Sequence, residues 1–189
     1  MSETLPESGY LDAARECIVA VGWRRTTLTD IARRAGVSRM TIYRRWPDTQ
    51  SLLADLLVRE WSELLLDSGL TDETHGSTRR QLANGIAGMV GLLRGNALFQ
   101  RIIELDPELL QPYLFERVGR NQKWILELTE EYLRAGQADG SVRKGDVQLL
   151  ARSLLLTTYG FVLSAPTLDV PVDGLDRELV TLIDRYLAP

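Results

Sequence analysis

The sequence predicts an all-α protein with a small N-terminal helix-turn-helix head and a larger helical body. Apolar residues recur at helical spacing along most of the chain, with turn residues between the periodic stretches. A turn glycine, Gly36, separates two short periodic segments near the N-terminus. Residues 24–46 contain seven arginines and one acid, a net charge of 7 − 1 = +6, although the chain as a whole carries −4. We therefore expect a basic head at residues 9–56 and an acidic body at residues 57–189.

Length and composition are those of an ordinary globular protein. The chain has 189 residues, of which 44% are hydrophobic and 25% charged, enough to bury a core. Its first ten residues contain neither the basic nor the apolar region of a secretory signal. The longest uncharged apolar stretch, residues 153–168, is interrupted and shorter than the ~20 residues that a membrane span needs. A single cysteine excludes an internal disulfide. We expect a soluble, cytoplasmic protein without a membrane partner.

The first helix is predicted over residues 10–21, after a disordered arm at residues 1–8. The helix ends at Gly22, and Trp23 is expected to pack near the turn that follows. Cys17 lies within this helix and is interpreted as a small packed residue, with a redox-sensing thiol as the alternative. Its apolar side consists of Leu11, Ala14, Ile18 and Val21.

Two short helices and a tight turn follow. Thr27, with Asp30 three positions later, predicts the start of the second helix. Gly36 predicts its end, because a glycine adopts the left-handed conformation without a Cβ clash. Ser38 caps a third helix at residues 39–46. The inward-facing residues are Leu28, Ile31, Ala32, Ala35, Ile42 and Trp46, with Val37 in the turn. This arrangement is typical of proteins that place the second helix of the motif in the major groove of DNA.

The same stretch resembles the N-terminal signature of the tetracycline-repressor (TetR) family. The resemblance covers residues 10–56, and the rest of the chain resembles the family only in length and helical character. It implies a homodimeric, ligand-responsive regulator of transcription, usually a repressor. The residues that carry the resemblance are Ala32, Ala35, Gly36, Val37, Ser38, Thr41, Ile42, Tyr43, Trp46, Leu52 and Leu53.

The third helix is predicted to read DNA. Arginine can hold a guanine edge with two parallel hydrogen bonds, so Arg39 and Arg44 are the base-reading candidates. Met40 or the Thr41 methyl group could contact a thymine methyl group. By resemblance, Tyr43 bonds a backbone phosphate and Thr41 is the neighbouring donor. The alternative for each residue is an exposed polar side chain without a partner. The predicted DNA-binding residues are Thr27, Ser38, Arg39, Met40, Thr41, Tyr43, Arg44, Arg45 and Thr49.

One position departs from the family pattern. The family usually has a phosphate-binding lysine three residues after the aromatic residue at Trp46, and here that position is Thr49. The hydroxyl group and the helix amides can still bind phosphate, with Asp48 as the predicted N-cap. Alternatively, Arg24, Arg25 or Arg45 supplies the charge.

The body is predicted to be helical throughout. A fourth helix at residues 48–68 links it to the head. A polar loop at residues 71–77 holds the only histidine, His75, which is interpreted as an exposed residue, so no metal and no cofactor are expected. Further helical segments are predicted at residues 78–94, 96–105, 107–115 and 116–135, with Gly136 at the end of the last one and a turn at residues 138–141.

Two residue sets are predicted in the body. An apolar ligand pocket would be lined by Met89, Leu92, Phe99, Ile103, Trp124, Leu128 and Tyr159, with plain core packing as the alternative. Residues 146–165 are apolar nearly all round, and a last helix starts at residue 173 or 174. We expect this antiparallel pair to meet its symmetry mate in a four-helix bundle, with a central core helix as the alternative. The predicted dimer residues are Leu150, Leu154, Phe161, Leu175, Leu179, Leu182 and Tyr186.

These features favour a DNA-binding homodimer that recognises a palindromic operator and is released by a small, mostly apolar inducer. A constitutive or architectural helix-turn-helix protein is the first alternative. A small helical enzyme is the second. It is disfavoured because the chain has one cysteine, one histidine, no glycine-rich phosphate loop and no Glu-x-x-His pair.

Overall fold

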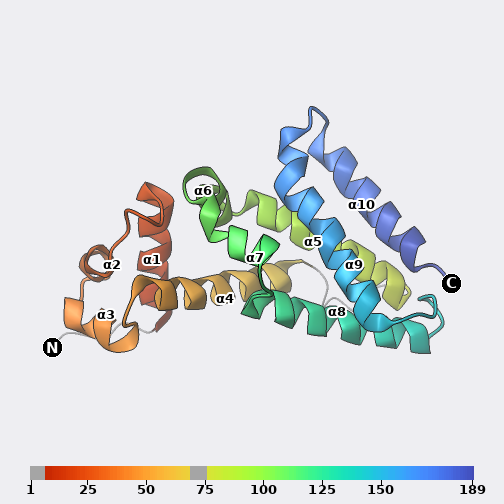
Figure 1. Ribbon diagram of the computed structural model, residues 1–189, viewed down its shortest axis with the longest axis horizontal. Coiled ribbons are helices and arrows are strands. Elements are labelled where there is room, and N and C mark those ends of the chain that lie inside the picture. Colours follow the sequence, from red (N-terminus) through yellow and green to blue (C-terminus); the bar gives the residue numbers. More distant parts are fainter. Residues whose placement is uncertain (1–6, 69–75) are drawn as a thin grey trace. The chain divides into compact units, whose positions relative to one another are not determined.

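The computed structural model describes residues 7–68 and 76–189, and every regular element in these ranges is helical (Figure 1). This confirms the predicted fold class. His75 lies outside the described residues. The α-helices are α1 (Glu7–Val21), α2 (Leu28–Arg34), α3 (Arg39–Arg45), α4 (Thr49–Asp67), α5 (Thr78–Gly95), α6 (Ala97–Leu105), α7 (Gln111–Phe115), α8 (Arg120–Ala138), α9 (Val147–Tyr159) and α10 (Val172–Leu187). The other helical turns are η1 (Pro107–Leu109), the π-helical η2 (Gly160–Ser164) and η3 (Ala165–Thr167).

The chain forms two compact units that are not consecutive in sequence. The first unit is Met1–Trp61 with Asn96–Arg117, and the second is Ser62–Gly95 with Val118–Pro189. The predicted boundary at residue 56 assigns residues 96–117 to the body. In the structure these residues form α6, η1 and α7, which pack with the N-terminal helices. The predicted arm also differs from the structure, because α1 already includes Glu7 and Ser8.

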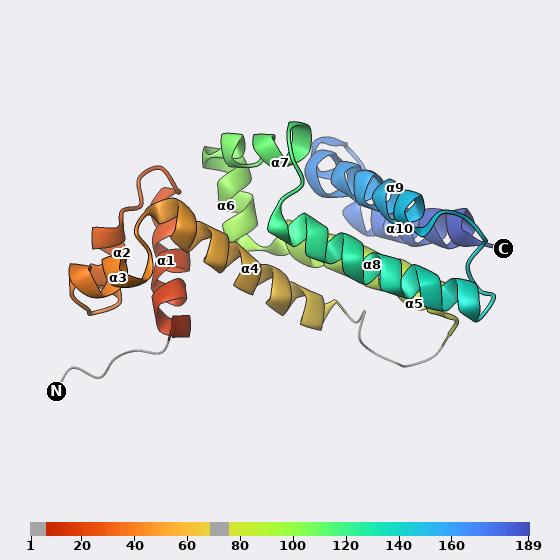
Figure 2. The same ribbon diagram turned by 60° about the horizontal axis from the view of Figure 1, so that its bottom comes forward.

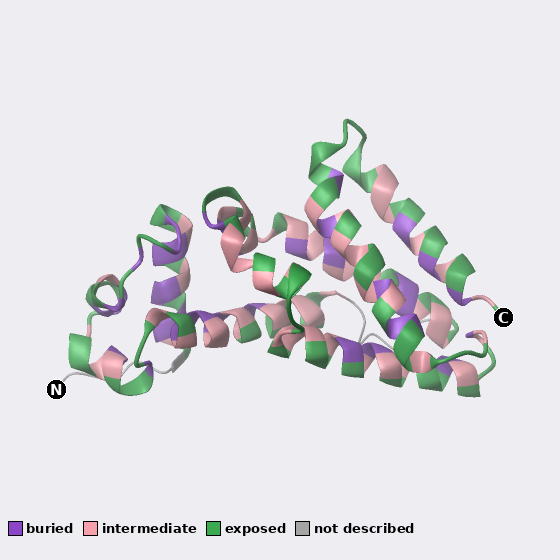
Figure 3. Cartoon of the chain, viewed as in Figure 1, coloured by how far each residue is buried: buried purple, intermediate pink, exposed green. Residues whose placement is uncertain are grey.

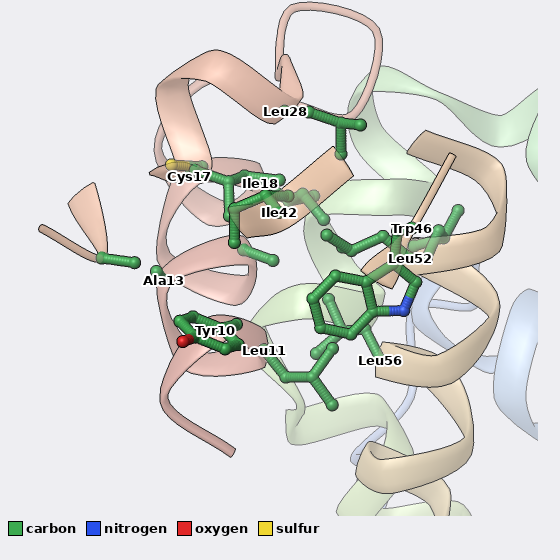
Figure 4. Packing of buried hydrophobic residues seen from close by; sticks show 14 of the residues in the cluster. Tyr10, Leu11, Ala13, Cys17, Ile18, Leu28, Ile42, Trp46, Leu52 and Leu56 are labelled. Atoms are coloured by element: carbon green, nitrogen blue, oxygen red, sulfur yellow. The ribbon is translucent and has the colours of Figure 1, made fainter. Parts of the chain in front are cut away.

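The first unit is organised around one apolar core. Ile18 of α1, Ile42 of α3 and Leu52 of α4 have no exposed surface, and Figure 4 shows their side chains converging. Trp46 meets the ring of Tyr10 edge-on, with ring centroids 6.3 Å apart. Its indole nitrogen donates a hydrogen bond of 2.9 Å to Asp55, so the one polar atom of this buried ring has a partner.

The start and end of each short helix follow from local chemistry. Thr27 Oγ1 accepts a hydrogen bond from the Asp30 amide, and Ser38 Oγ accepts one from the Thr41 amide. Asp48 accepts a hydrogen bond of 2.7 Å from the Ser51 amide, which confirms it as the cap of α4. Gly36 has φ +67°, the left-handed conformation that the turn requires. The predicted helix-turn-helix is confirmed.

In its described residues, the second unit contains four long helices. Within it α5 packs against α8 and α10, and α9 packs against α8 (Figures 1 and 2). Arg79 of α5 forms an ion pair of 3.0 Å with Asp184 of α10, and Arg94 forms a second ion pair with Asp176. These two pairs hold α10 along α5 beside the buried apolar residues Leu82, Leu179 and Ile183.

Two features of this unit differ from the expectation. The helix α8 continues through Gly136, whose ideal Cβ would lie 2.4 Å from Cγ2 of Val142, so glycine serves close packing there instead of ending the helix. The α9–η3 stretch, Val147–Thr167, is 21 residues long with a mean hydropathy of 1.3, which is enough to cross a membrane by length and composition alone. Core and interface helices of soluble proteins pass the same test.

The turn after α8 generates a prediction about pH. Asp139 accepts hydrogen bonds from the Thr78 hydroxyl at 2.5 Å and the Ser141 amide at 2.7 Å, and bonds of this kind from Ser141 and Thr78 lower its pKa to about 2. Because this pKa is lowered in the folded state, the stabilisation is complete above the ordinary value of 3.8 and is lost as the pH falls toward 2. Asp139→Asn should therefore lower the unfolding midpoint at pH 7, and the difference from the wild type should shrink below pH 4.

Denaturant unfolding at pH 7, 4 and 3 measures this difference. Asp169→Asn, a change at another exposed aspartate, is the control. A difference between Asp139→Asn and the wild type that stayed constant with pH would contradict the assignment.

Candidate nucleic-acid interface

The recognition helix α3 buries one side and exposes the other. Ile42 has no exposed surface, whereas Met40 is 74% exposed and Arg39, Arg44 and Arg45 are exposed (Figure 3). The buried side fixes the rotation of the helix in the core. The exposed side is therefore the one that is free to enter a DNA groove.

Exposed Arg39 contacts half-buried Tyr43 one turn later in the helix. The Arg39 guanidinium lies 4.7 Å from the centroid of the Tyr43 ring, and its Nη2 donates a hydrogen bond of 3.1 Å to the Tyr43 hydroxyl. Arg39 must exchange this contact for one with DNA if it reads a base. Arg44 has no hydrogen-bond or ion-pair partner among the residues that the structure describes, which makes it the better base-reading candidate of the two.

Three further arginines of the head form ion pairs with acids. Arg33 forms an ion pair with Asp30 at 2.9 Å, and Arg34 forms one with Glu16 at 2.8 Å. The Thr27 hydroxyl and, more weakly, Arg33 lower the pKa of Asp30. Arg24 is paired as well, with Glu108 at 2.5 Å. These three arginines are thus engaged by acids within the first unit.

Two arginines remain as substitutes for the missing family lysine. Arg25 is exposed and has no partner in the described part of the chain. Arg45 is exposed, and its guanidinium lies 6.0 Å from the centroid of the Trp46 ring. Thr49 is the first residue of α4 and is half-buried. Arg25 and Arg45 are consequently the better-placed candidates for phosphate binding.

The neighbouring hydroxyl groups shape the motif. Ser38 Oγ lies 2.9 Å from Thr41 Oγ1, within hydrogen-bond distance. Thr27 Oγ1 also donates a hydrogen bond to the Asp30 carboxylate. In the free protein these residues order the starts of α2 and α3. Their contacts with phosphate remain a prediction.

Cys17 is part of the core and not of the interface. Its side chain is buried, and burial raises the pKa of its thiol. A raised pKa reduces the thiolate fraction, which supports the interpretation as a packed residue over that of a redox sensor.

Two buried carboxylates that the sequence did not single out as functional also lie in the first unit. Asp106, at the end of α6, accepts hydrogen bonds from the Trp23 and Arg24 amides in the α1–α2 turn. Glu60 of α4 bonds Arg15 of α1 and Asn96, the N-cap of α6. In the sequence, Asp106 is marked only by its place before Pro107, and Glu60 only by its place among the apolar residues of the predicted fourth helix.

The predicted ligand-binding residues fall into both units. Met89 and Leu92 on α5, Trp124 and Leu128 on α8, and Tyr159 on α9 belong to helices that pack together in the second unit. Phe99 and Ile103 lie on α6 in the first unit. The Tyr159 hydroxyl accepts a hydrogen bond from Nε2 of Gln122, and burial raises the pKa of that hydroxyl.

The predicted dimer residues differ in how much surface they expose. Leu150, Leu154 and Leu179 are buried within the chain, so they have almost no surface for a second copy. Leu182 is 50% exposed and Tyr186 is 39% exposed, and Phe161 and Leu175 are half-buried. The predicted set therefore divides into residues that pack inside their own unit and residues that keep exposed surface.

The first unit presents an exposed basic helix as part of a helix-turn-helix, and the chain has a second helical unit. These features define a DNA-binding regulator of transcription. The comparisons with known proteins agree. The family model of bacterial regulatory proteins of the tetR family matches residues 11–56. The HTH-type transcriptional regulator Rv2250c of Mycobacterium tuberculosis is 38% identical over 99% of this chain and 98% of its own length. The chain belongs to the TetR family of transcriptional regulators.

Two further similarities support this assignment. The HTH-type transcriptional regulator AqdR of Rhodococcus erythropolis is 31% identical, over 92% of this chain and 81% of its own length. The crystal structure of the transcriptional regulator FadR from Bacillus subtilis in complex with stearoyl-CoA has a TM-score of 0.74 and covers 94% of this chain and 97% of its own. At 20% identity, that similarity is one of fold.

The different positions of Arg44, on α3, and Arg25, in the α1–α2 turn, generate a prediction. Arg44→Ala should weaken binding to the operator by about 1–3 kcal/mol and relax the preference at one base position, because a base-reading arginine is lost. Arg25→Ala should weaken binding to all DNA sequences alike and reduce the salt dependence, because only a phosphate contact is lost.

Fluorescence anisotropy with operator and random duplexes at two salt concentrations separates the two effects. Equal losses on both duplexes for Arg44→Ala would argue against base reading by this residue.

Proposed function

We propose that this protein is a repressor that binds a palindromic operator as a homodimer and releases it when a small, mostly apolar inducer binds. The observation that carries the proposal is α3 itself. Its inner side is fixed by the core, and its outer side presents Met40, Arg44 and Arg45 to solvent. Such a helix can contact base edges without any rearrangement of the head.

Dimerisation is supported by the apolar surface of the second unit. In Val147–Thr167, only 22% of the most apolar window is buried within the chain. Leu149 and Leu156 on α9, and Leu182 and Tyr186 on α10, are among the large apolar residues that remain exposed. An uncovered apolar surface of this kind is typical of a subunit interface. We assign the interface to these four residues and their neighbours.

A two-fold dimer explains the proposed operator symmetry. Two identical heads related by a two-fold axis meet identical half-sites on opposite strands, so the operator repeats as a palindrome. For this apolar helix we favour a subunit interface over a membrane, because a DNA-binding regulator has to reach its operator. We therefore place the protein in the cytoplasm.

The inducer class follows from the side chains predicted to line the pocket. Of the five predicted residues that lie in the second unit, Met89, Leu92 and Leu128 are wholly apolar, and Trp124 and Tyr159 add one polar atom each. Such a lining favours an apolar ligand with few polar groups. The stearoyl-CoA bound by the Bacillus subtilis FadR is a suitable first probe of that class.

The regulatory proposal predicts a ligand-dependent loss of DNA binding. Long-chain acyl-CoA, free fatty acids and apolar ring compounds should be titrated into the protein–operator complex, with coenzyme A alone as the control. An inducer should weaken operator binding by a factor of about 5–150, the usual range of coupling between two sites. Tight operator binding that no compound changes would favour the constitutive, architectural alternative. Turnover of a compound would favour an enzyme.

The interface assignment predicts the oligomeric state of two matched variants. Leu156 on α9 is 68% exposed and Leu66 on α4 is 70% exposed, so each accepts glutamate without disturbing the core. Leu156→Glu should convert the dimer to a monomer, because the new charge would be buried in the interface without a partner. Leu66→Glu should remain dimeric.

Sedimentation velocity at micromolar concentration distinguishes these states. A Leu156→Glu protein that stayed dimeric would place the interface elsewhere, and a monomeric wild type would exclude a dimer under those conditions.

A further inference from the structure

Residues 96–117 connect to the second unit at both ends and yet fold into the first unit. Within the first unit, α6 packs against α1. Arg101 of α6 donates a hydrogen bond of 2.8 Å from its Nε to the carbonyl oxygen of Val19, near the end of α1. The end of α6 then meets the α1–α2 turn, which leads into the helix-turn-helix.

Asp106 makes the central contact at this turn. Its Oδ2 accepts a hydrogen bond of 2.7 Å from the Trp23 amide, and its Oδ1 accepts one of 3.2 Å from the Arg24 amide. The residue is only 2% exposed. A carboxylate buried to this extent is costly unless it is hydrogen-bonded, and here each oxygen has its own backbone donor.

The surroundings of Asp106 are shaped to receive it. Gly22 has φ +85°, and an ideal Cβ at this position would lie 3.0 Å from Cδ1 of Leu105 and 3.1 Å from Oδ2 of Asp106. A larger residue would therefore be strained and would press on the carboxylate. On the outside, Arg24 forms an ion pair of 2.5 Å with Glu108. These contacts hold the turn from several sides.

We propose that Asp106 is a positioning residue for operator recognition: by fixing the α1–α2 turn onto residues 96–117, it fixes the recognition helix for sequence-specific binding. The proposal rests on the function proposed above. The fixed turn leads directly into α2, and α2 packs against both α1 and α3. The turn therefore determines the placement of α3 relative to the segment that connects with the second unit.

The proposal separates two kinds of DNA binding. Sequence-specific binding needs both recognition helices of a dimer at a fixed spacing. A loosened head has to become ordered when it binds the operator, and this ordering lowers the affinity. Phosphate binding depends on the exposed arginines and tolerates a loosened head. Loss of the Asp106 contact should therefore reduce specific binding more than non-specific binding.

Asp106→Asn is the variant that tests this. An asparagine has one acceptor oxygen, so one of the two amides must face an NH₂ group. Asp146→Asn is the matched control in the second unit. Asp146 caps α9, and a single oxygen, Oδ1, accepts from both the Gln148 and Leu149 amides, so asparagine can preserve both hydrogen bonds.

Full-length wild type and both variants are compared at a temperature at which circular dichroism shows each to be folded. Affinities for an operator duplex and a random duplex, sedimentation, and amide exchange at Trp23 and Arg24 are measured. For Asp106→Asn we expect operator affinity to fall at least about tenfold with random-duplex affinity unchanged, since a buried amide loses its acceptor. Exchange at Trp23 or Arg24 should accelerate, and the dimer should persist. Asp146→Asn should match the wild type.

The outcomes distinguish the two levels of the account. If the wild type shows no operator preference, the proposed function fails, and the positioning role fails with it. If the wild type prefers its operator and Asp106→Asn keeps the same ratio of specific to non-specific affinity, the positioning role alone is overturned. Should Asp106→Asn not fold, Glu108→Gln removes the outer ion pair and should lower the same ratio by a smaller factor. An unchanged ratio in that variant would overturn the proposal.

Discussion

The burial of the inner side of α3 is the constraint on which the DNA-binding head depends. A helix of seven residues is not stable in water by itself, because its few hydrogen bonds do not offset the cost of nucleation. Its stability comes from the burial of Ile42, from the cap at Ser38, and from the buried Trp46, whose amide donates a hydrogen bond to the Ile42 carbonyl at the end of the helix. This burial also determines which residues face outward. The reading surface of the head is therefore a consequence of the core beneath it.

The second unit shows the complementary situation, in which a core is complete and apolar surface remains. The helix α9 packs against α8, and α10 packs against α5. Both α9 and α10 still expose large apolar side chains. A monomer would leave these side chains in water, and a two-fold dimer would bury them. The same dimer would place two heads on one DNA duplex. The apolar surface and the basic helix thus serve one function from separate units.

The residues that could be predicted from the sequence are those whose structure depends on near neighbours. Thr27, Ser38, Gly36 and Asp48 act within three or four positions along the chain, and the structure has each at the helix end where it was predicted. The role of Asp106 could not be predicted, because its partners lie about 80 residues earlier in the chain. No local pattern encodes such a contact.

Periodicity was similarly informative about helices and uninformative about their partners. It located α9 and α10, and it identified Leu150 and Leu179 among their apolar residues. It could not decide whether such a residue faces the same chain or a second copy, because both surroundings are apolar. The structure places these two residues in the interior of the chain, with Leu149 and Leu182 exposed beside them. The two predicted pocket residues on α6 likewise belong to the first unit for reasons that depend on the fold alone.

The measurement that tests the central claim most directly is selection of binding sites from a random DNA library by the full-length protein at physiological salt. The account predicts enrichment of one two-fold symmetric sequence, with base preferences concentrated in two half-sites that the two recognition helices contact. Recovery of DNA without a sequence preference, at an affinity that depends only on salt, would contradict it.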